Sequence, residues 1–409
     1  MTQFTAIPDG TITAASGFQA AGVSAGLKGG EALDLALVYS EAPCTAAAVF
    51  TTNKVKAAPV LYDRQVLATN TAQIHACVIN SGCANACTGD VGMAASRETA
   101  TQAENSLGIP AGSALVMSTG VIGAQLPIAK IVSALPHAVS ALATGPDAGL
   151  AAAQAIMTTD TRPKTHAVRV SGEAGTFTIA GMAKGSGMIH PNMATMLSVI
   201  VTDAPITAAA LDVALRSCLD SSFHAITVDG DTSTNDTVLL LANGQSELPV
   251  IGGPKGELYE AFSDGLRHVA QRLAQEIVRD GEGATHFVQI DVRGAVSPDD
   301  AKRAAKAIAH SLLVKTAIYG RDANWGRILC AAGYSGAELD PDRAELWLGD
   351  LHVVHEGKPY DIDEERAEQI LAQYEITITL DLQLGTGEAT VWTSDLSHRY
   401  VDINAHYRT

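Results

Sequence analysis

The chain has 409 residues, of which 47% are hydrophobic and 17% are charged. This composition is typical of a compact globular enzyme and excludes a disordered, fibrous or coiled-coil chain, and the length favours two structural domains. The formal net charge of -17 argues against a nucleic-acid partner, because phosphate backbones are bound by clustered Lys and Arg. An acidic small substrate is still possible, since one or two well-placed cations can bind it.

The first half of the sequence predicts strands and helices in a mixed order. Apolar runs over residues 33–39 and 46–50 predict two buried strands on either side of Pro43. A helical pattern over residues 93–107 stops at Gly108, with Pro110 just beyond. Further strands are expected at 76–79, 114–117, 167–170 and 176–179, and further helices at 128–143 and 147–157.

The second half continues the mixed order, which excludes a simple doubly wound nucleotide-binding fold. We expect a main domain over residues 1–285 and a smaller C-terminal α+β domain over residues 286–409. Residues 400–404 alternate like a strand, which predicts an ordered tail. The other expected strands are 198–201, 237–241, 287–292, 346–354, 376–382 and 389–393, and the expected helices are 208–219, 258–278, 301–313 and 364–373.

The cysteines and the N-terminal segment bear on metal binding and location. Six cysteines in so long a chain do not form a disulfide framework. Cys83 and Cys87 are at near-ligand spacing, but no second Cys or His pair lies nearby, so buried thiols are favoured over zinc. The N-terminus has no basic segment followed by an apolar stretch, and no apolar run approaches membrane-spanning length. We therefore expect a cytoplasmic protein.

The segment that points most directly to chemistry joins two predicted strands, at residues 184–197, and reads KGSGMIHPNMATML. Its glycines permit unusual backbone angles, and Pro191 restricts its predecessor to extended geometry. Such a loop can hold a peptide bond in strain. If the Thr195 hydroxyl attacks the carbonyl of Ala194, the chain is cut between these two residues by an N-to-O acyl shift.

Cleavage would give Thr195 a free α-amine beside its own hydroxyl. An α-amine has an unperturbed pKa of about 8, so it can act as general base for the hydroxyl without a separate histidine. His190 is then assigned a structural role. Local composition alone leaves another interpretation open, in which the segment is a Gly-rich turn before a buried strand and Thr195 is an ordinary strand residue.

The wider sequence resembles the ornithine acetyltransferase (glutamate N-acetyltransferase) family over essentially its whole length. The resemblance rests on the 184–197 segment and on other blocks that occur in the same order. These are Gly17-Phe18, Ala21-Gly22, Asn80-Ser81-Gly82, residues 118–123 (STGVIG), 158–161 (TTDT), 228–237 (VDGDTSTNDT), 320–327 (GRDANWGR) and 404–409 (NAHYRT).

The resemblance implies a fold, a reaction and a nucleophile. The fold is α+β, a layered α/β sandwich of mixed sheets like that of DmpA and the ornithine acetyltransferases, with a smaller C-terminal α+β domain. Thr195 takes the acetyl group from N-acetylornithine as an ester and passes it to glutamate in a ping-pong cycle that serves arginine biosynthesis. No cofactor and no metal are needed. The Thr119 hydroxyl and the Gly120 N-H form the oxyanion hole.

The resemblance also implies which residues bind the substrates. Lys184 can meet a carboxylate and Glu282 the ornithine ammonium, while outside their motifs a lone Lys or Glu is usually a solvated surface charge. The tail is expected to return to the active site. The full substrate-binding set is Thr158, Lys184, Thr195, Glu282, Asn404 and Thr409.

The run 229–237 contains Asp229, Asp231 and Asp236, which could suggest a calcium or magnesium loop. It lacks the twelve-residue spacing and the terminal Glu of an EF-hand. We therefore interpret it as a structural turn network that supports the nucleophile.

Several alternatives stay open at this stage. A self-processing amidohydrolase or aminopeptidase would use the same nucleophile but pass the acyl group to water, and an uncleaved binding or scaffold protein would not use the motif at all. The sequence does not decide whether acetyl-CoA is a second acetyl donor. Fragments 1–194 and 195–409 should stay associated, and the resemblance implies a heterotetramer of two of each, with no nucleic-acid or membrane partner.

Overall fold

The structure is a computed structural model that describes residues 3–173, 175–190, 196–360 and 363–406. By its internal contacts the chain divides into two compact units. The large unit comprises the described residues of 1–224 and 231–277, and the small unit comprises residues 225–230 with the described residues from 278 onward. None of the helices described is both long and apolar enough to cross a membrane.

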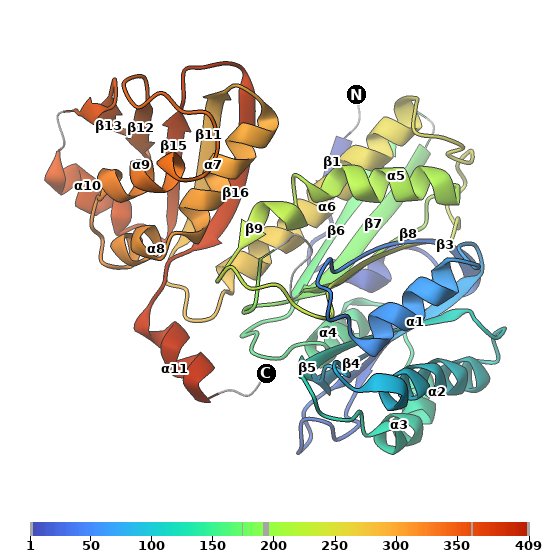
Figure 1. Ribbon diagram of the computed structural model, residues 1–409. Helices are drawn as coiled ribbons and strands as arrows, with labels where there is room; N and C mark the ends of the chain where they lie inside the picture. Colours follow the sequence, from blue (N-terminus) through green and yellow to red (C-terminus); the bar gives the residue numbers. More distant parts are fainter. Residues whose placement is uncertain (1–2, 174, 191–195, 361–362, 407–409) are drawn as a thin grey trace. The chain divides into compact units, whose positions relative to one another are not determined.

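The described part of the large unit is built on one nine-stranded mixed sheet (Figure 1). Its strand order is β1-β6-β7-β8-β10-β3-β4-β5, and β2 pairs with β3 beside this path. Strands β4 and β5 are parallel, as are β8 and β10, whereas the other pairs are antiparallel. The strands are β1 Gln3–Ala6, β2 Phe18–Val23, β3 Leu35–Phe50, β4 Ile74–Cys83, β5 Ala114–Val121, β6 Lys164–Gly172, β7 Gly175–Lys184, β8 Leu197–Thr202 and β10 Thr237–Ala242.

Helices cover both faces of this sheet. Strand β3 shows why, because alternate side chains enter two separate cores: Leu35 and Leu37 pack with residues of α2 and α3, whereas Ala36 and Val38 pack with residues of α4. Helix α6 packs on β7, where Leu273 leaves room only for Gly181. The helices are α1 Ala58–Leu67, α2 Gly89–Leu107, α3 Ile128–Ser140, α4 Pro146–Ala155, α5 Ala208–Leu219 and α6 Glu257–Arg279, which ends in the small unit.

The prediction of two strands on either side of Pro43 is wrong, because β3 runs unbroken over Leu35–Phe50. The pairing register with β4 shifts between Tyr39 and Cys44, so Pro43 occupies an irregularity where no regular ladder hydrogen bond is required. The predicted helix stop at Gly108 is confirmed, since this residue has the left-handed φ of 67° that ends α2.

The small unit is built on a seven-stranded sheet in its described part, with order β14-β13-β12-β15-β11-β16-β9. Residues of α7 and of the sheet share one core. The strands are β9 Ile226–Thr227, β11 Phe287–Ala295, β12 Glu345–Leu348, β13 Leu351–His355, β14 Lys358–Pro359, β15 Glu375–Asp381 and β16 Gly387–Ser394; the helices are α7 Pro298–His310, α8 Leu312–Tyr319, α9 Trp325–Gly333, α10 Glu364–Leu371 and α11 His398–His406.

Two predictions for this unit need correction. Residues 400–404 are not a strand but part of α11, because Tyr400 and Asn404 lie one helical turn apart and the Asn404 amide donates to the Tyr400 carbonyl. The single helix expected over 301–313 ends at His310, and Ser311 then caps the separate helix α8 by accepting from the N-H of Val314. The α+β class, with mixed sheets layered against helices, is confirmed.

Candidate functional site

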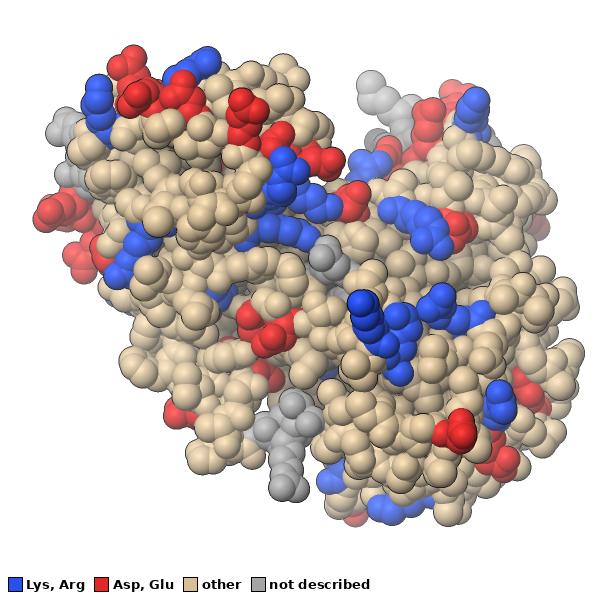
Figure 2. All heavy atoms as spheres, in the orientation of Figure 1, with Lys and Arg blue, Asp and Glu red and all other residues tan. Residues whose placement is uncertain are grey.

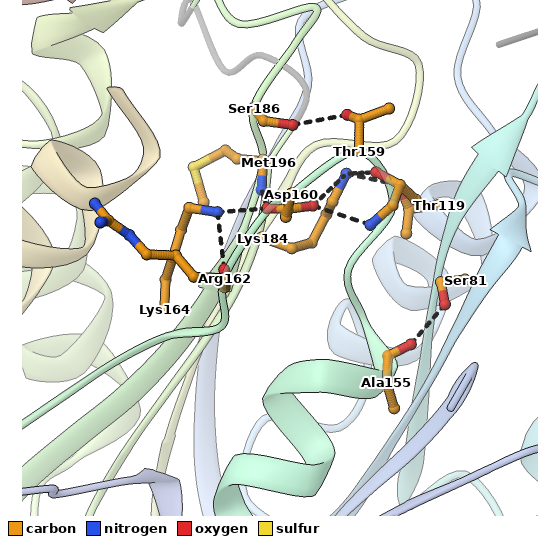
Figure 3. Close-up of polar contacts among 12 residues, drawn as sticks. Ser81, Thr119, Ala155, Thr159, Asp160, Arg162, Lys164, Lys184, Ser186 and Met196 are labelled. Carbon is orange, nitrogen blue, oxygen red and sulfur yellow. Dashed lines mark hydrogen bonds and ion pairs between the residues drawn. The ribbon is translucent and has the colours of Figure 1, made fainter. Parts of the chain in front are cut away.

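Three of the predicted site residues meet around the ammonium group of Lys184 at the end of β7 (Figure 3). Its Nζ donates to Thr158 Oγ1 at 2.7 Å and to Thr119 Oγ1 at 3.3 Å. Lys184 and Thr119 are buried. The large unit thus brings together residues that are far apart in the sequence, and Lys184 is not a solvated surface charge.

Asp160 is the residue of this cluster that the sequence analysis did not assign. Its Oδ1 accepts from Lys164 Nζ at 2.6 Å and from the N-H of Gly185 at 2.7 Å, and its Oδ2 accepts from the N-H of Thr158 and lies 4.0 Å from Lys184 Nζ. Burial raises the pKa of Asp160, but the ammonium groups of Lys184 and Lys164 and these hydrogen bonds outweigh that effect. The net pKa is therefore below the usual value.

Asp160 therefore stays ionised, and it joins the loop after α4, which contains Thr158, to the loop after β7, which begins at Gly185. It compensates the buried charges of Lys164 and Lys184, whose side chains are 0% and 3% exposed. The Thr159 and Ser186 hydroxyl groups join the same two loops at 2.7 Å. The only signal in the sequence was the position of Asp160 inside the 158–161 block.

Gly120 lies where a side chain has no room. It pairs with Gly82 across the parallel strands β4 and β5. Its φ is +130°, and a Cβ there would lie 2.4 Å from the Gly82 carbonyl carbon. Both features require glycine. The chain thus passes very close to β4 directly after Thr119.

The side chains of Asn235 and Asp236 form hydrogen bonds with β5 and with the residue that precedes β8. The Asn235 amide donates to the Ser118 carbonyl at 2.8 Å, and Asp236 Oδ1 accepts from the N-H of Met196 at 2.9 Å. Burial raises the pKa of Asp236 well above its usual value, against the hydrogen bond from Met196 that lowers it. The residue before Thr119 and the residue after position 195 are therefore held by the same two-residue segment.

Ala194, Thr195 and Thr409 lie outside the described residues, so the cleavage site, the nucleophile and the last substrate-binding residue stay predictions. The remaining two predicted residues, Glu282 and Asn404, belong to the small unit. There the Asn404 amide donates to Glu282 Oε2 at 2.7 Å, which fixes helix α11 against the loop that follows α6.

The large unit also has a basic pocket of about 730 Å³ beside β3. Lys56, Arg64 and Arg216 line it, together with His224 and residues 48–52. Figure 2 shows Lys and Arg side chains gathered on the face drawn, over helix α1. One wall of the pocket adjoins the Asn235-Asp236 segment, because the N-H of Thr51 donates to the Asp236 carbonyl at 2.9 Å.

Comparison with known proteins gives the family. The family model described as "ArgJ family" matches residues 19–409. The arginine biosynthesis bifunctional protein ArgJ of Symbiobacterium thermophilum is 52% identical over 402 residues, which cover 98% of this chain and 99% of that protein. The protein of the same name from Geobacter sulfurreducens is 51% identical over 395 residues, covering 96% and 99%.

A crystal structure of ornithine acetyltransferase complexed with ornithine, from Mycobacterium tuberculosis, is 43% identical and covers 47% of this chain and 98% of that chain, with a TM-score of 0.42. The family model and the curated relatives both extend over nearly the whole chain. The chain therefore belongs to the ArgJ family.

Proposed function

We propose that this chain is a glutamate N-acetyltransferase of arginine biosynthesis, which moves the acetyl group of N-acetylornithine to glutamate. Family membership supports the reaction. The observation that carries the chemistry is the cluster of Lys184, Thr119 and Thr158, which offers a buried cation and two hydroxyl groups in one place.

Thr195 is proposed as the nucleophile, exposed by self-cleavage after Ala194. The supporting observation is that Met196, the next residue in the chain, is fixed by Asp236, whose neighbour Asn235 is hydrogen-bonded to the carbonyl before Thr119. The α-amine of Thr195 would take the hydroxyl proton during attack on the acetyl carbonyl and return it to the leaving ornithine amine. The glutamate amine then attacks the acetyl ester.

The oxyanion of each tetrahedral intermediate is assigned to Thr119 and Gly120. Because Lys184 donates to Thr119 Oγ1, that oxygen acts as an acceptor toward the ammonium and its own proton is available for the oxyanion. The nearby positive charge makes the hydroxyl a stronger donor. The position of Gly120, held close to β4, fixes the direction of its N-H.

Substrate groups are assigned by charge. Lys184 and Thr158 would bind the α-carboxylate that both amino-acid substrates share, and Glu282 would bind the ornithine side-chain ammonium. Asn404 orients the Glu282 carboxylate through its 2.7 Å hydrogen bond, and Thr409 completes the proposed set. A tail that returns to the active site is part of the same proposal, whereas the predicted boundary between residues 285 and 286 differs from the structure, in which the small unit begins at residue 278 and includes residues 225–230.

The basic pocket supports acetyl-CoA as a second acetyl donor. Lys56 and Arg64 offer positive charge to phosphate groups, and the Thr51 wall adjoins the segment that holds Met196. Replacing Lys56 and Arg64 by Ala should raise KM for acetyl-CoA and leave KM for N-acetylornithine unchanged, with the exposed Arg267→Ala as control. An equal rise in both KM values would argue against this second donor.

We propose a cytoplasmic enzyme in which fragments 1–194 and 195–409 form a heterotetramer of two of each. Size measurement in solution, combined with a denaturing gel, tests this composition.

The reaction itself is tested by initial rates with N-acetylornithine and glutamate varied together. A ping-pong cycle gives parallel double-reciprocal lines and N-acetylglutamate as the product. Acetate release at the same rate without glutamate would instead favour the amidohydrolase or aminopeptidase alternative, because water would then be the acceptor.

A further inference from the structure

The small unit carries a cluster of two imidazoles and one carboxylate on the β12–β13 hairpin. His352 Nε2 lies 2.7 Å from Glu345 Oε2, and His355 Nδ1 lies 3.0 and 3.1 Å from the two carboxylate oxygens. One atom from each of the three side chains lies within 4.8 Å of the others. No part of the acetyl-transfer chemistry above uses these residues.

A β-bulge brings the two histidines to the same side. Residues three apart in a regular strand point to opposite faces. Here Leu346 pairs with Val354 but Trp347 pairs with His352, so β13 has one extra residue. Val353 and Val354 are both fully buried. The histidines on either side of them therefore share the outer face with Glu345, and bulges commonly re-aim side chains in this way at functional sites.

The carboxylate is oriented by the backbone. Glu345 is 9% exposed, and its Oε1 accepts from the N-H of Glu356 at 3.0 Å. The carboxylate is thus held in one orientation, as carboxylate ligands of metal ions are in proteins.

Two aromatic rings pack against the imidazoles of the cluster. Trp347 stacks on His352 with ring centroids 4.5 Å apart, and Tyr360 lies 4.9 and 5.2 Å from the two imidazoles. The side chains of His352 and His355 are 26% and 49% exposed. Both imidazole side chains are therefore partly accessible to solvent.

We propose that Glu345, His352 and His355 form a binding site for a divalent transition-metal ion of the zinc type. Two imidazoles and one carboxylate are a ligand set that suits Zn²⁺, Ni²⁺ or Cu²⁺, whereas Ca²⁺ and Mg²⁺ prefer oxygen ligands alone. A tetrahedral ion at about 2.0–2.1 Å from each atom needs ligand atoms roughly 3.3 Å apart. The present hydrogen-bonded distances of 2.7 Å and 3.0 Å would open by roughly 0.6 Å and 0.3 Å, and water would fill the fourth position.

The site has a structural consequence for the hairpin. Glu345 is on β12, and both histidines are on β13, so a bound ion would cross-link the two strands.

The test uses the purified full-length protein after treatment with a chelator. Titration calorimetry with Zn²⁺ should show one ion per chain, and His352→Gln and Glu345→Gln should each weaken binding by at least about tenfold. His355 is more exposed than Glu345 and His352. His355→Gln therefore repeats the test if either of the other two variants fails to fold. His398→Gln, in the same unit and outside the cluster, should bind as the unaltered chain does.

Fluorescence locates the ion. Cu²⁺ should quench the emission of the unaltered chain, and Trp347→Phe should remove most of that quenching while leaving Zn²⁺ affinity within about threefold, because Trp347 stacks on a ligand without being one. Equal Zn²⁺ affinity in the unaltered chain and the His352→Gln/His355→Gln double variant would overturn the proposal and leave a hydrogen-bonded network only. Quenching that persists fully in Trp347→Phe would overturn it as well.

Discussion

Replacing Thr119 by Val removes one hydroxyl group from the Lys184 cluster and preserves side-chain shape. Loss of one oxyanion donor typically lowers kcat about 10²–10³-fold. The structural cost is smaller, because Lys184 loses a 3.3 Å acceptor but keeps Thr158 at 2.7 Å and the Asp160 carboxylate. One such hydrogen bond contributes about 1 kcal/mol to the free energy of unfolding.

The assay is steady-state acetyl transfer between N-acetylornithine and glutamate, with unfolding in urea measured in parallel. Thr119→Ser should recover much of kcat because it restores the hydroxyl. The matched control is Thr202→Val, which removes a buried 2.8 Å hydrogen bond to the Thr178 carbonyl elsewhere in the same sheet and should leave kcat unchanged. A kcat for Thr119→Val within about threefold of the unaltered enzyme would refute the oxyanion assignment, since a lost donor should cost far more.

Gly120→Ala should abolish turnover, because the added Cβ would lie 2.4 Å from a backbone atom at a φ of +130°; rates near normal would contradict that geometry. Asp236→Ala should lower the free energy of unfolding by about 2 kcal/mol by leaving the buried N-H of Met196 without its acceptor, whereas Asp236→Asn, which keeps an acceptor oxygen, should cost less. Burial lowers the pKa of Lys315 to about 8 from 10.5, so between these pH values the unfolded chain binds more protons than the folded chain. The free energy of unfolding should therefore rise by about 3 kcal/mol from pH 8 to 10.5. Lys315→Met should lose this pH dependence, and an unchanged dependence would contradict the assignment. Deleting residues 404–409 should abolish turnover and spare self-cleavage, as judged by assay and denaturing gel, and retained turnover would remove the tail from the site.

Much of the fold could be predicted because strong local signals coincide with tertiary structure. The apolar face of residues 208–219 and the Gly108 stop are such signals, and α5 has the predicted bounds. The errors arise where tertiary context decides. Pro43 is accommodated by a register shift in β3, and the five residues 400–404 were too few to distinguish alternation from the helix that Asn404 stabilises.

The candidate site divides in the same way. Lys184, Thr119 and Thr158 were identified through motifs, and the structure places them in contact. Asp160 was missed because its role depends on two buried lysines that only the folded chain brings to it. The cluster of Glu345 and the two histidines was not predictable, because strand alternation places His352 and His355 on opposite faces of β13. The bulge between them brings both to the same face.

The most direct test of the central claim is the intact mass of the purified protein under denaturing conditions, before and after brief exposure to N-acetylornithine alone. The account predicts two fragments that meet between Ala194 and Thr195, and one acetyl group added to the C-terminal fragment only. A single uncut and unmodified mass would contradict both self-cleavage and the acetyl-threonine intermediate.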